Sequence, residues 1–483
     1  MSRFRTLLPL TVAACTLAAG TLAAASALAT PALAGSRPAK ARPAARPAAS
    51  RLAEVRAPGY VADPTRPLGA HDPNNPIKHI VIVMQENHSF DQYLGMLPVS
   101  GQPLADGFTF DSNGVPTNSN PVAGGKVQTV FHRTSLCPGD SAGQSWNNTH
   151  AEINGGKMDG FAQLDRNAMS YYTQADLPFY YSLATQYTLA NRWFASAPAQ
   201  TYPNRRFLYA GTAYGNLTTS TSSLLDDPPP NGTIQDQMSA HGVSWKDYAT
   251  NAPNVGIVGS NVKTHPTNIT QLSQFFVDAK TGRLPSVSYV DSGIGIADLA
   301  LGPTDSTTAN APAAVQDKIF QAESTGTNEE GDDVRVGQKW VSRVVKAVTS
   351  GPDWGSTLLI WLYDEHGGFY DHAVSPKAIA PDDIKPQLKA DDVPGGYDQL
   401  GIRVPAVIVS PYSRPHAVSN VVHDHTSVLA QIERLWNLPA LTYRDANAAD
   451  LSDFLDLSHP SLMTPAPLSA PGPYNLSSCH RGQ

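Results

Sequence analysis

The chain has 483 residues, of which 41% are hydrophobic, and it carries a formal net charge of −7. A chain of this length has room for one large α/β domain or for two domains. The acidic balance argues against nucleic acid as a partner, because the phosphate backbone selects basic proteins.

The N-terminus has the features of an export signal. Arg3 and Arg5 open the chain, an apolar alanine-rich stretch follows, and Ala32-Leu33-Ala34 offers a small-residue cleavage site. We therefore expect a signal peptide over residues 1–34 and a secreted protein. A membrane anchor is the alternative, because the apolar stretch is long enough to cross a bilayer.

Composition divides the rest of the chain into three parts. Residues 35–75 are expected to form a flexible tether rich in alanine, proline and arginine, with at most peripheral contact to a membrane. Residues 76–460 form the expected catalytic domain, and residues 461–483 a C-terminal tail. After loss of the signal, Cys137 and Cys479 remain, and a disulfide between them suits an exported protein.

Apolar strands alternate with amphipathic helices along the catalytic domain, which predicts the α/β class. Long intervals rich in glycine, asparagine and proline separate these elements and are expected to form substrate-facing walls. The expected strands are Ile80–Met84, Tyr187–Phe194, Val243–Tyr248, Ser286–Asp291, Thr357–Tyr363 and Val404–Val409, and the expected helices are Ser89–Leu97, Val334–Val348 and His425–Leu438.

Two of the apolar runs end in oxygen-bearing side chains. Glu86 and Asn87 close the first run, and Asp364 and Glu365 close a much later one. Open α/β sheets place their ligands at the carboxyl ends of the strands, so these four side chains predict one composite metal site. Carboxylate and amide oxygens favour a single hard divalent ion such as Ca²⁺, Mg²⁺ or Mn²⁺, with Zn²⁺ also open.

A hydroxyl nucleophile is the next requirement of such a site. Thr201 precedes the helix start at Pro203, and a hydroxyl at the positive end of a helix beside a divalent ion would be activated. The alternative is that Thr201 serves only as a helix cap. Ser89 and Ser196 are rival hydroxyls.

Two histidines are expected near the same site. His372 follows the double glycine after Glu365 and can fold back over the site, and His425 opens the last helix. At the start of a helix, the His425 imidazole would bind a phosphate oxygen or protonate a leaving alkoxide. The alternative for His425 is a structural neighbour of a helix cap made by Asp424 or Thr426.

From His79 to about Phe454 the chain resembles the bacterial phosphoesterase family of non-haemolytic phospholipases C and an acid phosphatase. The resemblance implies an alkaline-phosphatase-like three-layer α/β/α fold, with long loop excursions over the site, and hydrolysis through a covalent phosphoenzyme. It also places Glu86, Asn87, Asp364 and Glu365 at the metal-ligand positions, Thr201 at the nucleophile, and His372 and His425 near the phosphate. The segments that carry it are Gln85–Asp91, Asn154–Phe161, Pro203-Asn204-Arg205, Gly242–Trp245, Asp364–His372 and His425–Leu429.

Two positions depart from the family pattern. Gln144 stands before Ser145-Trp146 where members often have histidine. Members also often have His-Pro-Pro after a glutamate and before the Val334 helix, where this chain reads Glu329-Glu330-Gly331-Asp332-Asp333 and places Glu330 at the histidine position. Both changes remove potential phosphate donors and bear on the phospholipid preference.

These observations predict a phosphate-ester hydrolase of the phospholipase C kind, with a phospholipid among its possible substrates. A phosphomonoesterase of the acid phosphatase type is the first alternative. A non-catalytic binding protein on the same scaffold is the second, although the retained hydroxyl and oxygen ligands argue against it. The Cys-x-Pro-x-Arg signature of sulfatases is absent from the chain.

Overall fold

A single mixed sheet of eight strands forms the centre of the protein, described by the computed structural model for residues 55–138, 143–225, 228–250, 252–291 and 333–473. In their order across the sheet, the strands are β12 (Val418–Ser419), β6 (Thr188–Ala190), β11 (Ala406–Val409), β10 (Thr357–Tyr363), β1 (His79–Gln85), β9 (Val287–Val290), β7 (Trp245–Ala249) and β8 (Ile269–Gln271).

Strands β10, β1, β9, β7 and β8 are parallel, and only β11 runs against both of its neighbours. The β1–β10 register pairs Gln85 with Tyr363, so the two strands end side by side. Every residue of β10 is buried, as expected of a strand covered on both faces.

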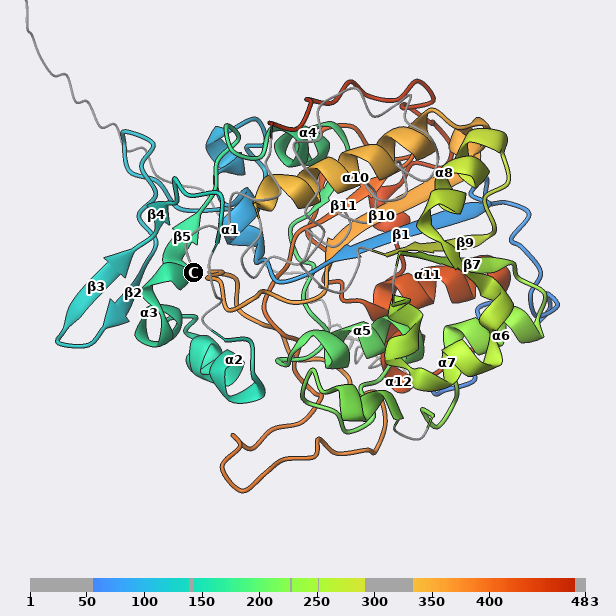
Figure 1. Ribbon diagram of the computed structural model, residues 1–483, viewed down its shortest axis with the longest axis horizontal. Helices are drawn as coiled ribbons and strands as arrows, with labels where there is room; N and C mark the ends of the chain where they lie inside the picture. The colour runs from blue at the N-terminus through green and yellow to red at the C-terminus, as the bar shows by residue number, and fades with distance from the viewer. Residues whose placement is uncertain (1–54, 139–142, 226–227, 251, 292–332, 474–483) are drawn as a thin grey trace, which may run out of the picture. The chain divides into compact units, whose positions relative to one another are not determined.

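Helices cover the two faces of the sheet (Figure 1). Contacts among the elements separate the helices into two layers, one on each face of the sheet. Together with the sheet between them, these layers confirm the expected α/β class with three layers. One layer contains α4 (Pro178–Gln186), α8 (Leu272–Thr281) and α10 (Val334–Thr349), and the other contains α5 (Thr201–Ala210), α6 (Ile234–Ala240), α7 (Gly259–Thr264), α11 (Thr426–Trp436) and α12 (Tyr443–Asn447).

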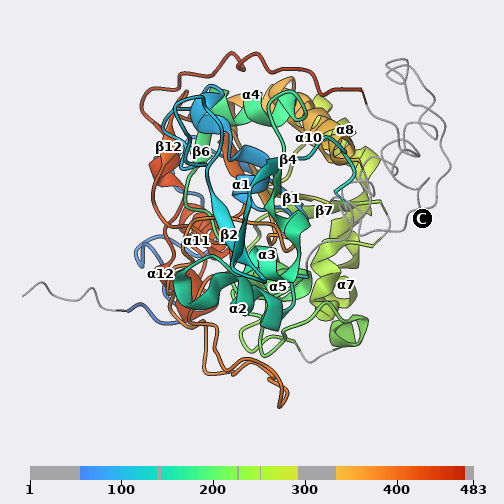
Figure 2. The same cartoon turned by 90° about the vertical axis from the view of Figure 1, so that its left-hand side faces the viewer.

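A long excursion follows the carboxyl end of β1. Figures 1 and 2 both place it beyond that end of the sheet, in agreement with the expected loop walls. Its elements are α1 (Phe90–Leu94), β2 (Ser119–Val122), β3 (Lys126–Thr129), β4 (Phe131–His132), α2 (Trp146–Ile153), α3 (Phe161–Leu164) and β5 (Ser170–Tyr171).

Residues 55–75 correct the expected extent of the tether. The Gly59 amide donates to Ala440 O at 2.8 Å, and the Asp72 amide donates to Leu435 O at 2.8 Å. Backbone hydrogen bonds to the end of α11 and the turn after it thus hold this segment on the domain. Residues 55–75 therefore belong to the domain rather than to the expected tether.

Several expectations concern residues that lie outside the described part of the chain. They are the signal peptide over residues 1–34, the tether up to residue 54, Glu329-Glu330 and Cys479. Cys137 is disulfide-bonded. Across the described ranges, no helix combines the length and apolarity needed to span a bilayer.

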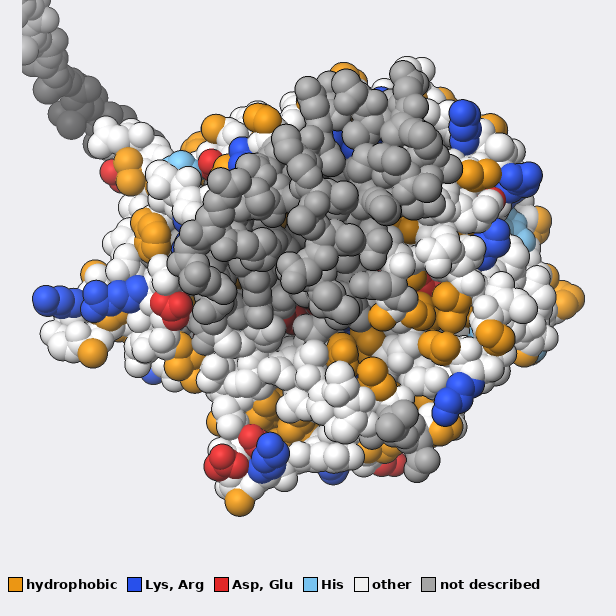
Figure 3. Space-filling view, in the orientation of Figure 1, with side chains coloured by type: hydrophobic (Ala, Val, Ile, Leu, Met, Phe, Trp, Pro, Cys, Tyr) orange, Lys and Arg blue, Asp and Glu red, His pale blue; other side chains and the backbone are white. Residues whose placement is uncertain are grey.

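The charges on one face of the protein are mixed. On the face shown in Figure 3, Lys and Arg side chains stand singly or in small groups among Asp, Glu and hydrophobic side chains. The coloured part of that face therefore carries no broad field of one sign.

Candidate active site

The carboxyl ends of β1 and β10 meet, and direct contacts there link Glu86, Asn87 and Asp364, three of the four expected metal ligands, while Glu365 follows Asp364 in the chain. The Asp364 amide donates to Gln85 O at 3.0 Å, and the Asn87 amide donates to Asp364 Oδ1 at 3.3 Å. A Cβ at Gly367 would lie 2.1 Å from Asn87 O, so the turn after Glu365 passes directly against the end of β1.

Asn87 has the left-handed backbone conformation, with φ at +67°. Adjacent side chains of a regular strand point to opposite faces, so this change of direction lets Glu86 and Asn87 serve one site. Asparagine tolerates the left-handed region better than most residues do. Gly367, at φ +63°, makes the corresponding reversal after β10.

Arg205 joins the two strand ends. Its Nε donates to Asp364 Oδ2 at 2.9 Å, and its Nη2 donates to Glu86 Oε1 at 3.2 Å. The side chains of Arg205 and Asp364 are 1% and 0% exposed, so the guanidinium compensates buried negative charge. The motif that contains Arg205 was noted in the sequence, but its role was not.

Glu365 belongs to a buried chain of charged groups. Its Oε2 accepts from the Gly367 amide at 2.9 Å and lies 3.3 Å from His366 Nδ1, while His366 Nε2 lies 2.7 Å from Glu152 Oε2. Burial raises the pKa of Glu365 to about 7. Burial opposes a charge on His366, but Glu152 and Glu365 raise its pKa to about 9.

Gln144 also reaches the site. Its Nε2 donates to Asn87 Oδ1 at 3.3 Å. The residue that departs from the family pattern thus contacts one of the expected metal ligands. An amide oxygen has two lone pairs, so this bond leaves Asn87 Oδ1 able to accept a second partner.

Thr201 is the first residue of α5, where it is 6% exposed. Arg205 follows it by four residues and therefore lies on the same face of the helix. Burial and the charge of Glu86 raise the pKa of Tyr202, so the start of α5 lies close to the strand ends. The rival Ser89 caps α1 and donates to Tyr370 O at 2.6 Å, and Ser196 accepts from the His425 amide at 3.1 Å.

His425 lies against Asp364. Its Nε2 donates to Asp364 O at 2.7 Å, and its Nδ1 accepts from Trp193 Nε1 at 3.4 Å. The ring is fully buried, and burial lowers its pKa. Both nitrogens therefore have protein partners, and the direct role in proton transfer expected for His425 stays a prediction.

His372 belongs to a separate ion-pair network. Its Nδ1 lies 2.7 Å from Asp91 Oδ2, and its Nε2 lies 3.3 Å from Asp106 Oδ1. Burial opposes its charge, but Asp91 and Asp106 raise its pKa to about 10. Arg403 pairs with Asp91 at 3.0 Å and with Asp371 at 3.1 Å.

Asp91, Asp371 and His372 lie close enough together to hold a metal ion. The buried Arg403 already supplies a cation to both carboxylates, so we describe this group as an ion-pair network. Of the two predicted histidines, only His425 has a direct contact with the four strand-end residues within the described chain.

The four strand-end residues fit a divalent cation. Glu365 Oε1 is buried without a hydrogen-bond partner among the described atoms, which leaves an oxygen in need of one. Three carboxylates and one amide supply only oxygen donors, the set that hard cations prefer. Arg205 and His366 supply two positive charges against the four carboxyl groups of Glu86, Asp364, Glu365 and Glu152, so a further cation suits the remaining charge.

The sequence alone did not predict the contacts made in the site by Arg205, Gln144 and Glu152. Glu152 lies within α2, and no local pattern marks it as a partner of His366. The position of Arg205 could have been predicted from its spacing. A basic residue one helical turn after a predicted nucleophile lies on the same face of the helix and so faces the same site.

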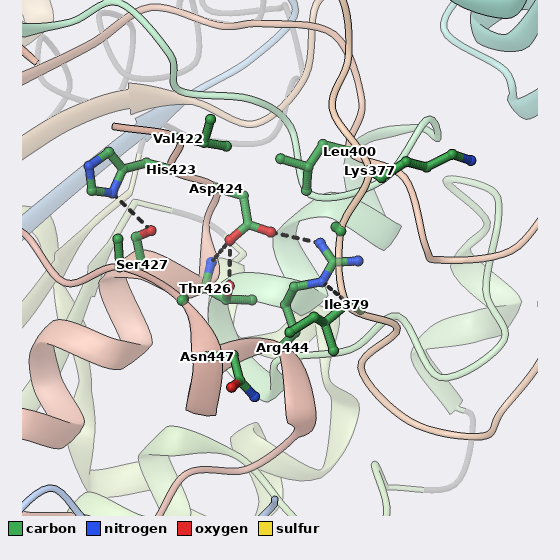
Figure 4. A pocket seen from close by; sticks show the side chains of 13 residues that line it. Lys377, Ile379, Leu400, Val422, His423, Asp424, Thr426, Ser427, Arg444 and Asn447 are labelled. Carbon is green, nitrogen blue, oxygen red and sulfur yellow. Dashed lines mark hydrogen bonds and ion pairs between the residues drawn. The ribbon is translucent and has the colours of Figure 1, made fainter. Parts of the chain in front are cut away.

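A pocket of about 150 Å³ lies beside the start of α11 (Figure 4). Asp424 and Arg444 form an ion pair in it at 2.8 Å, and Asp424 Oδ1 also accepts from the Thr426 amide. Asp424 thus satisfies the amide of the first residue of α11, whose N-cap position is His425. None of the seven predicted site residues lines this pocket.

Comparison with known proteins identifies the family of the chain. Non-specific phospholipase C1 of Arabidopsis thaliana is 31% identical over 423 residues, which cover 80% of this chain and 72% of that protein. Phospholipase C B of Mycobacterium tuberculosis is 28% identical, covering 80% and 78%. Non-hemolytic phospholipase C of Burkholderia pseudomallei is 29% identical, covering 80% of this chain and 59% of that protein.

The model of the Phosphoesterase family matches residues 77–439, which include all seven predicted site residues. That match confirms the expected family and the expected class of enzyme, a hydrolase of phosphate esters. The chain belongs to the Phosphoesterase family.

Proposed function

We propose that the chain is a secreted, metal-dependent phosphodiesterase of the phospholipase C kind, which works through a phosphothreonine at Thr201. The relatives named phospholipase C support the substrate class. One observation carries the mechanism. Arg205 binds Glu86 and Asp364 from a helix whose first residue is Thr201, so hydroxyl and oxygen ligands belong to one assembly.

Two displacements at phosphorus make up the proposed reaction. In the first, Thr201 Oγ1 forms a bond to phosphorus, the bond from phosphorus to the alcohol oxygen breaks, and that oxygen takes up a proton. In the second, water attacks the phosphothreonine, which releases the phosphate product and restores the threonine hydroxyl.

The residues of the site have distinct tasks in this proposal. A divalent cation held by Glu86, Asn87, Asp364 and Glu365 would lower the pKa of the hydroxyl and neutralise charge on the phosphate. Arg205 orients Glu86 and Asp364, and the hydrogen bond from His425 fixes the backbone of Asp364. The burial of these groups strengthens each electrostatic interaction.

Mass spectrometry of protein quenched during turnover tests the nucleophile. We expect a mass increase of one phosphoryl group, or of its alcohol ester, on the peptide that contains Thr201. The same modification on Ser89 or Ser196 instead would contradict the mechanism.

A paired assay tests the substrate class. We expect the protein to release phosphocholine from phosphatidylcholine faster than it hydrolyses nitrophenyl phosphate. The opposite order would favour the phosphomonoesterase alternative. Binding of either compound without turnover, with divalent cations present, would favour the non-catalytic alternative.

A further inference from the structure

The β2–β3 hairpin projects from the excursion that follows β1, and Figure 1 shows it pointing away from the central sheet. One of its faces is anchored on α3. Asn120, 1% exposed, donates from Nδ2 to Met158 O at 3.2 Å, and its Oδ1 accepts from the Phe161 amide at 3.1 Å. Val122 is buried in the same apolar cluster as Phe161. The hairpin is therefore held rigidly by its inner face.

The opposite, outward face of the hairpin consists of Ser119, Pro121, Val127 and Thr129. The register pairs Pro121 with Val127, so the two side chains lie on one face. Ser119 and Thr129 form the next outward pair. Val127 is 66% exposed, and the turn over residues 123–125 is exposed as well. The described residues thus leave an uncharged, partly apolar face uncovered.

The charges around this face are positive. Lys126 begins β3 at an exposed position, and residues 112–138 contain Lys126, His132 and Arg133 but no Asp or Glu. An apolar tip with a lysine at its edge suits the boundary of a lipid bilayer. Apolar groups enter there between the headgroups, and lysine is attracted to anionic lipid.

The hairpin is also linked to the candidate active site. Asn118, directly before β2, donates from Nδ2 to Tyr370 OH at 3.4 Å, and Tyr370 belongs to the loop that follows Glu365. The same excursion supplies Glu152, whose carboxylate lies 2.7 Å from His366 Nε2. The hairpin and the site therefore lie on the same side of the sheet, beyond the carboxyl end of β1.

We propose that the β2–β3 hairpin docks the protein on a phospholipid bilayer, with its outward face at the level of the headgroups. Pro121 and Val127 enter the boundary between headgroups and acyl chains, and Lys126 pairs with anionic lipid. This inference deepens the proposed function and rests on it for the choice of a lipid as partner. Docking through the hairpin places the candidate active site on the side of the protein that faces its substrate.

A second copy of the chain is the alternative occupant of the outward face. A two-fold contact brings the same patch of both copies together, so Lys126 would approach its own equivalent. Like charges at such a contact disfavour the pairing, whereas an anionic bilayer attracts the same lysine. Charge complementarity therefore favours the bilayer.

Vesicle binding of the full chain tests the docking. Thr201→Val serves as the background, so that the lipid is not consumed, and binding to vesicles of phosphatidylcholine and phosphatidylglycerol is measured by co-sedimentation. We expect added Val127→Asp to weaken binding about 10-fold or more. Val277→Asp makes the same change on α8, at a residue that is 44% exposed, and should bind like the background. Equal affinity of the two variants, or no binding by the background, would overturn the proposal.

The contribution of Lys126 has its own test. Lys126→Gln should weaken binding to these vesicles about 5-fold, because one lysine is lost from the anionic surface. Lys280→Gln removes the same charge from α8 and should leave the affinity unchanged. An equal loss in both variants would overturn the proposed contact of Lys126 with the lipid.

A polarity-sensitive dye locates the contact directly. We expect the emission of dye-labelled Val127→Cys to shift to shorter wavelength when vesicles are added, and that of labelled Val277→Cys to stay unchanged. No shift at residue 127 would overturn the docking. A shift that appears without vesicles as the protein concentration rises would identify a second copy as the occupant, which also overturns it.

These results are separate from those that judge the proposed function. If no phosphorylated peptide is found but Val127→Asp loses vesicle binding, the phosphothreonine mechanism fails and the docking stands. If the phosphorylated peptide is found and Val127→Asp binds vesicles like the background, the docking alone fails.

Discussion

Arg205 donates from Nε to Asp364 at 2.9 Å in a setting where both side chains are almost fully buried. Asp364 is the first residue after β10, so this bond ties the central sheet to α5. The pair also leaves each partner dependent on the other, because an isolated buried charge is strongly disfavoured.

Replacing Arg205 should therefore destabilise the protein. We expect Arg205→Met to lower the free energy of unfolding by about 3–5 kcal/mol, because it leaves Glu86 and Asp364 buried without their cation. Urea denaturation in the presence of a chelator measures this loss. Arg166→Met, at an exposed position, is the control and should change the value by less than about 0.5 kcal/mol. An unchanged stability for Arg205→Met would contradict the role assigned to the ion pairs.

Thr201 should be essential for turnover but not for folding. We expect Thr201→Val to reduce kcat by a factor on the order of 10³ or more, because the variant lacks the hydroxyl proposed to form the covalent intermediate. Thr201→Ser should retain part of the activity. Thr264→Val makes the same change at an exposed position of α7 and should leave kcat unchanged. Substantial turnover by Thr201→Val would exclude Thr201 as the nucleophile.

Gln144 should influence metal affinity through Asn87. Gln144→Leu removes the hydrogen bond to Asn87 Oδ1, and we expect the divalent-cation affinity of the strand-end site to fall by about 10- to 100-fold, as for other supports of metal ligands. Titration calorimetry with Mn²⁺ provides this affinity independently of catalysis. Gln163→Leu, on the exposed side of α3, should bind the metal like the wild type. If Gln144→Leu also binds the metal like the wild type, then Gln144 does not position Asn87.

The ion pair between His372 and Asp91 should make stability fall at alkaline pH. The folded-state pKa of about 10 lies above the ordinary histidine pKa of about 6.5, so the stabilisation is complete below about pH 6.5 and is lost as the pH rises toward 10. We expect a loss of a few kcal/mol between pH 7 and 10, measured by urea unfolding at each pH.

His372→Asn should flatten that alkaline decline. His459→Asn, whose ring is 84% exposed, serves as the control and should follow the wild-type curve. A wild-type decline that survives in His372→Asn would assign the effect to another group.

The ends of β1 and β10 could be predicted from the sequence because the pattern that marks each of them lies within a few neighbouring residues. A continuous apolar run followed by acids is visible at β1 and at β10, and the parallel register then brings Glu86 and Asp364 together. The strand expected over Tyr187–Phe194 was partly wrong, since β6 covers only Thr188–Ala190. Trp193 and Phe194 instead form isolated bridges beyond it.

Other features depend on contacts between distant segments. α4 is buried along most of its length, so it lacks the polar stripe by which a surface helix is found. Residues 55–75 read as tether from their composition, but hydrogen bonds to residues near 435–440 order them. The hydrogen-bond partners of His425 are Trp193, which follows β6, and Asp364, which follows β10. The sequence around residue 425 contains no pattern that predicts these contacts.

The reversed backbone at Asn87 restricts which side chains can occupy that position. Aspartate shares both the tolerance for positive φ and an oxygen donor, whereas glycine keeps the chain direction but offers no ligand. Bulkier residues would strain the very bend that Gly367 packs against. The proposed metal site thus requires two properties of this position, a tolerance for positive φ and an oxygen donor, so exchanges there separate loss of backbone geometry from loss of the proposed coordination.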